Sequence, residues 1–151
     1  HEITMKRLKI SGPILIVDDD PDEHLIVVDI CKTIGISEHL KFFHSGPDLV
    51  EFLNTTSTQP FLILCDINMP GFNGMETRRS IDADPKLKRK SIPFVFFSTS
   101  VNAEQVTAAY DLTVQGFFLK GNTFSETRER LVRIFEYWCD CKHPNSRDLA
   151  I

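Results

Sequence analysis

Residues 14–20 read ILIVDDD, so four aliphatic residues stand directly before three aspartates. The apolar run Phe61–Cys65 ends in the same way, at Asp66. Short aliphatic runs bounded by polar residues are typical of strands buried in a parallel sheet, whose ligands bind beyond the carboxyl ends of the strands. If these two strands are neighbours, Asp18, Asp19 and Asp66 converge on one point.

Carboxylates that are packed together repel one another and resist ionisation unless a cation neutralises them. The expected cluster therefore favours a hard divalent metal with oxygen ligands. Magnesium takes one or two carboxylates together with waters and phosphate oxygens, which suits Asp19 and Asp66. We therefore expect Mg²⁺ as the cofactor.

A strand–helix alternation repeats five times along the chain. The expected strands are Ile14–Val17, Leu40–Phe43, Phe61–Cys65, Phe94–Phe97 and Gly116–Leu119. Helix-start signals follow them, such as Asp20 before Pro21. The last expected helix carries an apolar stripe that indicates a buried face: Leu131, Ile134, Phe135 and Trp138. This alternation predicts an α/β fold in which helices cover both faces of one parallel sheet.

Length and composition fit a single domain. A chain of 151 residues with 42% hydrophobic residues can bury one core, and its net charge of −4 gives no reason to expect direct nucleic-acid binding. No apolar stretch has the length of a membrane span or the pattern of a signal peptide, so we expect a cytoplasmic protein without a membrane partner. Residues 1–12 are interpreted as a tail that an expression vector could contribute, residues 13–140 as the domain, and residues 141–151 as a second tail.

The four cysteines do not form a secreted disulfide pattern. Cys31 and Cys65 fall in apolar segments and are expected to be small buried hydrophobes. Cys139, Cys141 and His143 form a C-x-C-x-H cluster, but structural zinc sites need four ligands and wider pair spacing. A frayed helix end with exposed thiols is the favoured interpretation.

One basic run, KLKRK at residues 86–90, follows Asp84-Pro85. We interpret it as a solvated connection between a helix and a strand.

The remaining chemistry stands after the last two expected strands, which lead into Ser98 and Lys120. A carboxylate such as Asp66 can attack a phosphoryl group and hold it as an acyl phosphate. Ser98 and Lys120 can then stabilise the phosphoryl oxygens, and Lys120 is expected to pair with Asp66. No nucleotide-binding glycine motif is present, so the phosphoryl group must arrive on something other than bound ATP.

The chain resembles the receiver domains of response regulators in two-component signalling over about residues 13–140. The resemblance rests on Asp18-Asp19, Asp66-Ile-Asn-Met-Pro70, Ser98 and Lys120, each at the correct strand end. It implies a three-layer, flavodoxin-like (βα)5 fold, a doubly wound parallel sheet with strand order 2-1-3-4-5. That order makes the first and third strands neighbours, as the acidic cluster requires.

The resemblance also implies a role for each site residue. Asp66 is the phosphoacceptor, with Ser98 and Lys120 as its catalytic partners on the phosphoryl oxygens. The metal ligands implied are Asp18, through water, Asp19, Asp66 and the backbone carbonyl of Asn68. Phe117 falls where the family places an aromatic residue that turns inward on activation.

Two residues depart from the family pattern. Gly121 follows Lys120 where receivers usually have proline in a cis peptide, and a non-proline cis bond costs about 2.5–4 kcal/mol. We therefore expect this peptide to be trans or its loop to be mobile. Thr99 follows Ser98 where the family often has a smaller residue, and its side chain could narrow access to Asp66.

The implied function is that of a bacterial single-domain response regulator, not an enzyme beyond assisting its own phosphorylation and dephosphorylation. A histidine kinase or phosphotransfer protein supplies the phosphoryl group, and an unknown protein target receives the signal. Too few residues follow Trp138 for an output module. The face formed by the helix after Asn102, the strand Gly116–Leu119 and the helix after Thr123 would contact that target or form a homodimer. A weaker resemblance is to phytochrome-associated receivers, and it rests on the long connection around Asp84–Lys90, on Thr99-Ser100 and on Tyr137-Trp138.

Three alternatives remain open. A haloacid-dehalogenase-type phosphatase would need a D-x-D-x-[TV] nucleophile after the first strand, whereas Asp18–Asp22 leads into a capped helix. A calcium loop would need glycine at the position of Glu23. A degenerate receiver that binds partners without phosphorylation is suggested by Gly121 and Thr99.

Overall fold

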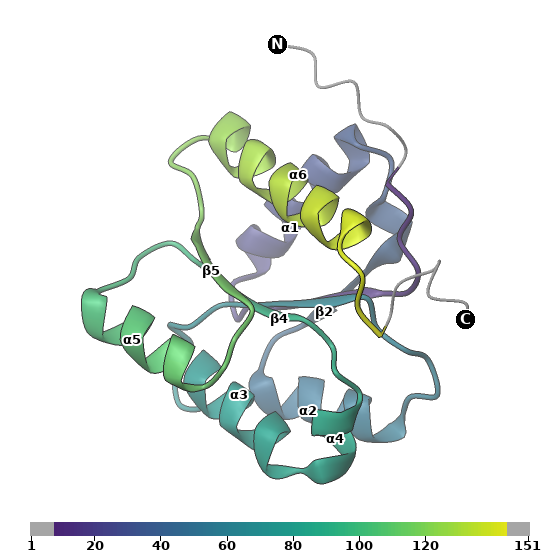
Figure 1. The fold of residues 1–151 in the computed structure, drawn as a ribbon. Coiled ribbons are helices and arrows are strands. Elements are labelled where there is room, and N and C mark those ends of the chain that lie inside the picture. Colours follow the sequence, from purple (N-terminus) through teal and green to yellow (C-terminus); the bar gives the residue numbers. More distant parts are fainter. Residues whose placement is uncertain (1–7, 145–151) are drawn as a thin grey trace.

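The computed structural model describes residues 8–144 of the chain, and its centre is a five-stranded parallel sheet (Figure 1). The strands are β1 Ile14–Val17, β2 Leu40–Phe43, β3 Leu62–Cys65, β4 Phe94–Ser98 and β5 Gly116–Leu119. Their order is β2-β1-β3-β4-β5, which confirms the prediction. The third strand begins one residue later than expected, and the fourth extends by one residue to include Ser98.

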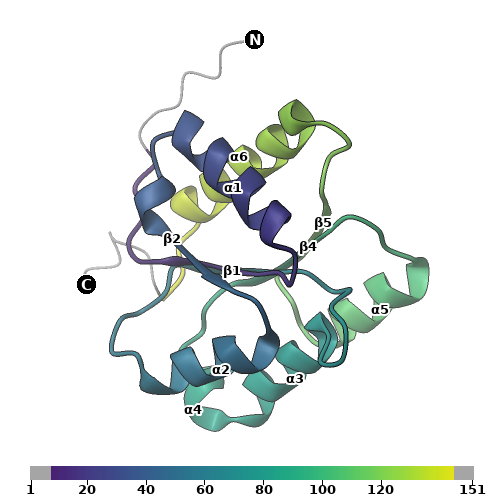
Figure 2. The ribbon, with the colours of Figure 1, turned by 180° about the vertical axis from the view of Figure 1, so that it is seen from behind.

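Helices cover both faces of the sheet. They are α1 Pro21–Thr33, α2 Gly46–Thr55, α3 Gly74–Ala83, α4 Pro85–Arg89, α5 Ala103–Asp111 and α6 Phe124–Asp140, with a 3₁₀ turn η1 at Ser37–His39. Helices α1 and α6 lie on one face and α2 to α5 on the other (Figures 1 and 2). The three-layer, doubly wound architecture is therefore confirmed.

The two faces of the sheet build separate hydrophobic clusters. Ile14 and Ile16 of β1 pack into the cluster with α1 and α6, whereas Leu15 and Val17 pack into the cluster with α2, α3 and α5. Central strands of a parallel sheet are apolar at every position because both faces are covered. The apolar stripe predicted for the last helix is buried in the first cluster: Leu131, Ile134, Phe135 and Trp138.

The basic run is not a loop, and that prediction was wrong. Residues 85–89 form the short helix α4, in which Asp84 Oδ1 accepts a hydrogen bond of 2.9 Å from the Lys86 amide and Pro85 occupies the first turn. Leu87 is buried and anchors the helix to the cluster on that face. An N-cap, a proline and one apolar anchor therefore outweigh the charge of the run. The helices expected after Asn102 and after Thr123 are α5 and α6.

The end of α6 is packed and not frayed, contrary to expectation. His143 is buried, with its ring edge-on to Trp138 and Phe61 at centroid distances of 5.4 and 5.5 Å, and Cys139 and Cys141 are half-buried. These three residues form no metal-ligand cluster in the part of the chain that the structure describes. Cys31 and Cys65 are buried as predicted.

The division into tails and domain stays a prediction. Residues 1–7 and 145–151 of the proposed tails lie outside the described residues. No helix between residues 8 and 144 is long and apolar enough to span a membrane.

Candidate phosphoacceptor and metal site

The carboxyl ends of β1 and β3 bring three aspartates together. Val17 pairs with Cys65 in the sheet, so the next residue of each strand, Asp18 and Asp66, lies at the same edge. One carboxylate oxygen from each of Asp18, Asp19 and Asp66 lies within 4.8 Å of the others. Such a set of oxygen donors fits a hard divalent cation.

Asp18 is buried and fully engaged. Its Oδ2 lies 2.7 Å from Lys120 Nζ, and its Oδ1 accepts a hydrogen bond of 3.0 Å from the Asp20 amide. Its backbone carbonyl lies 2.7 Å from His24 Nε2. Both carboxylate oxygens of Asp18 therefore already have a protein partner, which favours contact with an ion through water.

Lys120 pairs differently from the sequence-based prediction. Its ammonium contacts Asp18 and lies 3.2 Å from Glu23 Oε2, and no direct pair with Asp66 forms among the described residues. Burial lowers the pKa of Lys120, but the hydrogen bond and charge of Asp18, followed by the charges of Glu23 and Asp66, raise it overall. Lys120 is therefore a charged group that offsets part of the negative charge at this edge of the sheet.

Sequence reasoning missed Glu23 and His24. Both lie in the first turn of α1, which begins directly after the acidic stretch and turns these side chains back toward Asp18. The position of Glu23 three residues after Asp20 predicts an acid in the first turn of a helix, but it does not indicate that this acid pairs with Lys120.

Asp66 is half-buried and has one free oxygen. Ser98 Oγ donates to Asp66 Oδ1, and the Asn68 amide donates to the same oxygen at 3.4 Å. Oδ2 has no hydrogen-bond partner within residues 8–144. Burial raises the pKa of Asp66, the Ser98 hydrogen bond lowers it, and the charges of Asp18 and Lys120 act in opposite directions; the net shift is upward. The ionised form of Asp66 would gain from a nearby cation.

The loop after Asp66 is held on both sides. Asn68 Nδ2 donates to the Ser100 carbonyl at 3.2 Å, and Gln105 Nε2 donates to Asn68 Oδ1 at 3.0 Å, which ties the loop to the start of α5. A Cβ at Gly74 would lie 2.3 Å from the Asp66 carbonyl oxygen. Only glycine lets α3 begin this close to the Asp66 backbone.

The peptide between Lys120 and Gly121 is trans, as are the other described peptides. The Gly121 amide donates to Thr127 Oγ1 at 3.0 Å, so the loop is anchored to α6. A Cβ at Gly121 would lie 2.3 Å from Glu126 Cβ and 2.6 Å from the Thr127 amide nitrogen. Proline would lose the hydrogen bond and meet the same clash, which explains the departure from the family pattern.

The other predicted residues lie around this site. Ser98 is fully buried, whereas Thr99 is exposed. Phe117 is half-buried on β5 and packs against Phe96 at a centroid distance of 5.7 Å. Its role as a switch stays a prediction.

These features define a flavodoxin-like domain with an acidic site at the switch point of its sheet. The family model described as the response regulator receiver domain matches residues 14–132. The chain therefore belongs to the response regulator receiver family. Members of this family are signalling proteins that bind divalent metal at the acidic pocket and interact with histidine kinases and downstream targets.

Similar proteins include response regulator Rcp1 of Synechocystis, 31% identical over 132 residues that cover 84% of this chain and 88% of Rcp1. Chemotaxis protein CheY-3 of Vibrio cholerae is 29% identical over 82% of this chain and 91% of its own length. The phosphorylated cyanobacterial phytochrome response regulator RcpA has a TM-score of 0.78 at 27% identity, covering 88% of this chain and 98% of RcpA. The Mn²⁺-bound structure of Rcp1 has a TM-score of 0.74 at 30% identity, covering 87% and 97%. The weaker resemblance to phytochrome-associated receivers is thus confirmed.

Proposed function

We propose that this receiver accepts a phosphoryl group on Asp66 and signals by phosphorylation-dependent contact with another protein. The observation that carries the proposal is that Asp66, whose Oδ2 has no hydrogen-bond partner among the described residues, belongs to the cluster with Asp18 and Asp19. Ser98 holds the other oxygen of the same carboxylate. One edge of the sheet therefore holds a nucleophilic oxygen, a cluster of carboxylates that can bind a metal ion, and an ammonium group.

The donor set fits Mg²⁺. Asp19 is exposed and, like Asp66 Oδ2, has no partner in the described part of the chain, so these two can bind the ion directly. Asp18 would act through water because its oxygens are engaged, and the backbone carbonyl of Asn68 would complete the protein ligands. The bound ion would neutralise charge on the carboxylates and the phosphoryl oxygens.

The proposed step is an in-line phosphoryl transfer. Asp66 Oδ2 attacks phosphorus, an O–P bond forms, and the bond between phosphorus and the donor breaks. The donor leaves with the electron pair and takes up a proton from solvent. The Ser98 hydroxyl and the Lys120 ammonium stabilise the charge that spreads over the three remaining oxygens.

A histidine kinase or a phosphotransfer protein is the proposed upstream partner, in the cytoplasm. The similarity to Rcp1 and RcpA supports a phytochrome-type kinase as that partner. The chain acts on no separate substrate in this proposal and only assists its own phosphorylation and dephosphorylation.

The proposal is tested by incubating the protein with acetyl phosphate and Mg²⁺ and measuring intact mass. One phosphoryl adduct is expected, and hydroxylamine should remove it because it cleaves acyl phosphates. No adduct from acetyl phosphate or from a histidine kinase would reject the proposal and favour a phosphorylation-independent binding module.

Asp19 and Asp20 should respond differently to alanine. Asp20 Oδ1 accepts a hydrogen bond of 2.9 Å from the Asp22 amide and caps α1, so Asp20→Ala should lower the free energy of unfolding by about 0.5–2 kcal/mol. Asp19→Ala should instead weaken Mg²⁺ binding with little loss of stability. Mg²⁺ titration by NMR and chemical denaturation separate the two effects, and equal loss of Mg²⁺ affinity in both variants would contradict the proposed ligand assignment.

The signal is proposed to leave through the face of α5, β5 and α6, where a homodimer or a target would bind. Phe117→Ala should leave phosphorylation of Asp66 intact but remove the coupling to that face, which is worth about 1–3 kcal/mol in typical coupled sites. Hydrogen exchange with and without beryllofluoride is the measurement. Phe118→Ala is the matched control because Phe118 packs into the cluster on the opposite face of the sheet. An unchanged response of residues 100–135 in Phe117→Ala would show that Phe117 does not carry the coupling.

A further inference from the structure

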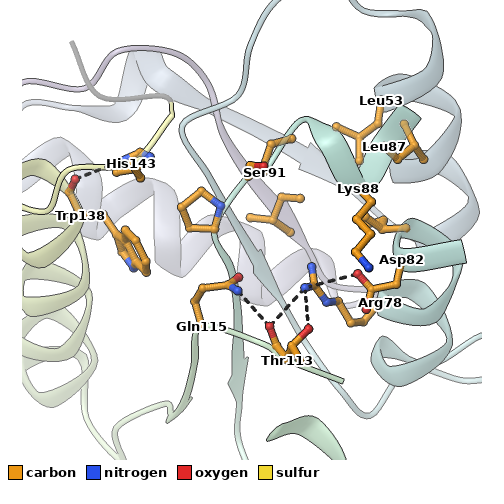
Figure 3. Close-up of a pocket in the computed structure, with 14 residues that line it drawn as sticks. Leu53, Arg78, Asp82, Leu87, Lys88, Ser91, Thr113, Gln115, Trp138 and His143 are labelled. Carbon is orange, nitrogen blue, oxygen red and sulfur yellow. Dashed lines mark hydrogen bonds and ion pairs between the residues drawn. The ribbon is translucent and has the colours of Figure 1, made fainter. Parts of the chain in front are cut away.

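A cavity of about 270 Å³ lies at the opposite edge of the sheet from Asp66, beside the amino-terminal ends of β3 and β4 (Figure 3). Half of the residues that line it are apolar, among them Leu53, Ile63, Ile81, Leu87, Pro93 and Trp138. Two cationic side chains line it, Arg78 of α3 and Lys88 of α4, and one carboxylate, Asp82, lines it as well. Ligand pockets commonly combine an apolar wall with a few placed polar groups, and this cavity has that composition.

Arg78 is buried, and two of its guanidinium nitrogens, Nε and Nη2, bind neighbouring protein groups. Nε donates to the Leu112 carbonyl at 3.2 Å, and Nη2 donates to the Thr113 carbonyl at 3.2 Å and lies 3.4 Å from Asp82 Oδ1. The hydrogen bonds and the ion pair of Arg78 with the described residues involve only Nε and Nη2, so Nη1 has no such partner among them. A buried guanidinium with an unpaired N–H group is costly, and an anion would satisfy it.

The rim of the cavity is held in an unfavourable backbone conformation. Ser91 and Thr113 have φ values of 52° and 57°, and they are the two non-glycine residues in the left-handed region within residues 8–144. Each follows the end of a helix, where glycine would remove the strain. Both line this cavity, where they keep hydroxyl groups that glycine would not supply. Such strain clusters at ligand sites.

The surroundings are positively charged. Lys86, Arg89 and Lys90 line a neighbouring hollow that shares Leu87 with the cavity, and none of the described residues that line it is a carboxylate. The basic run of α4 therefore places a positive field at the mouth of the cavity, which would draw an anion toward it.

We propose that this cavity binds a small amphipathic anion, in which a carboxylate or phosphate group contacts Arg78 Nη1 and Lys88 while an apolar body fills the wall beside Leu87 and Pro93. The site is independent of the phosphoacceptor and does not rest on its proposed function.

The test is a titration of ¹⁵N-labelled protein with four probes, followed through the amides of Ser91, Thr113 and Gln115. Benzoate and phenyl phosphate carry both the charge and the apolar body, benzamide carries only the body, and inorganic phosphate carries only the charge. Benzoate or phenyl phosphate should bind about tenfold more tightly than benzamide, which cannot make the charge-assisted hydrogen bond, and than inorganic phosphate, which buries no apolar surface. The stronger of the two identifies the acidic group.

Lys88→Gln should weaken that binding about threefold. Lys86→Gln, which removes an exposed lysine of the same helix that lines only the other hollow, should weaken it clearly less, because Lys86 acts only through the positive field. Arg78→Lys should weaken it about tenfold, provided that thermal unfolding shows a folded variant. Equal binding of benzamide and benzoate, shifts confined to residues 86–90, or equal loss in Lys86→Gln and Lys88→Gln would each overturn the proposal.

Discussion

Asp66→Asn is expected to abolish the phosphoryl adduct completely. Asparagine keeps the oxygen that accepts the Ser98 hydrogen bond but replaces the free Oδ2 with an amide nitrogen that is not a nucleophile. Intact-mass spectrometry after incubation with acetyl phosphate and Mg²⁺ measures the adduct.

The matched control is Asp22→Asn, which removes an exposed carboxylate of α1 that is not part of the three-aspartate cluster. That variant should be phosphorylated to the same extent as the protein without a substitution. Excess chelator should prevent the adduct in both the control and the unmodified protein, because the cluster of Asp18, Asp19 and Asp66 needs a cation. An adduct that persists in Asp66→Asn, or that forms equally well in chelator, would show that another group accepts the phosphoryl.

The sheet and its acidic edge could be predicted because their causes are local. Uninterrupted aliphatic runs define buried strands, and the carboxyl ends of neighbouring parallel strands must share an edge. These two rules predict that Asp18 and Asp66 converge, and the structure shows that they do. The strand order itself came from the family resemblance and not from the periodicity.

The side-chain pairing could not be predicted, because it depends on the geometry of α1 relative to β5. Three carboxylates lie at the predicted edge, and the first turn of α1 adds Glu23. In the structure the Lys120 ammonium contacts Asp18 and Glu23. Helix α4 differs from the prediction for another reason. The charge of residues 86–90 predicts a solvated loop, whereas the N-cap at Asp84 favours a helix. The anchoring role of Gly121 depends on how closely α6 approaches, which no pattern in the sequence reveals.

Lys120→Met is expected to destabilise the metal-free protein strongly. The ammonium is buried between Asp18 and Glu23, and removal of one partner from a buried ion pair costs about 3–5 kcal/mol because the remaining charge is uncompensated. Urea denaturation in the presence of chelator measures the free energy of unfolding. Lys32→Met, which removes an exposed lysine of α1, should leave that free energy nearly unchanged.

The pH dependence and the response to Mg²⁺ identify the cause of the loss. Because the pKa of folded Lys120 is raised above its ordinary value of 10.5, the pair stabilises the fold fully below that pH, and the contribution disappears as pH rises through the folded pKa. The difference between Lys120→Met and the unmodified protein should therefore be constant around neutral pH. Added Mg²⁺ should restore part of the stability, since the ion supplies positive charge to the same carboxylates, and Asp18→Asn in the Lys120→Met background should do the same. If Lys120→Met and Lys32→Met unfold at the same urea concentration in chelator, Lys120 does not neutralise the acidic edge, and the electrostatic account of this site is wrong.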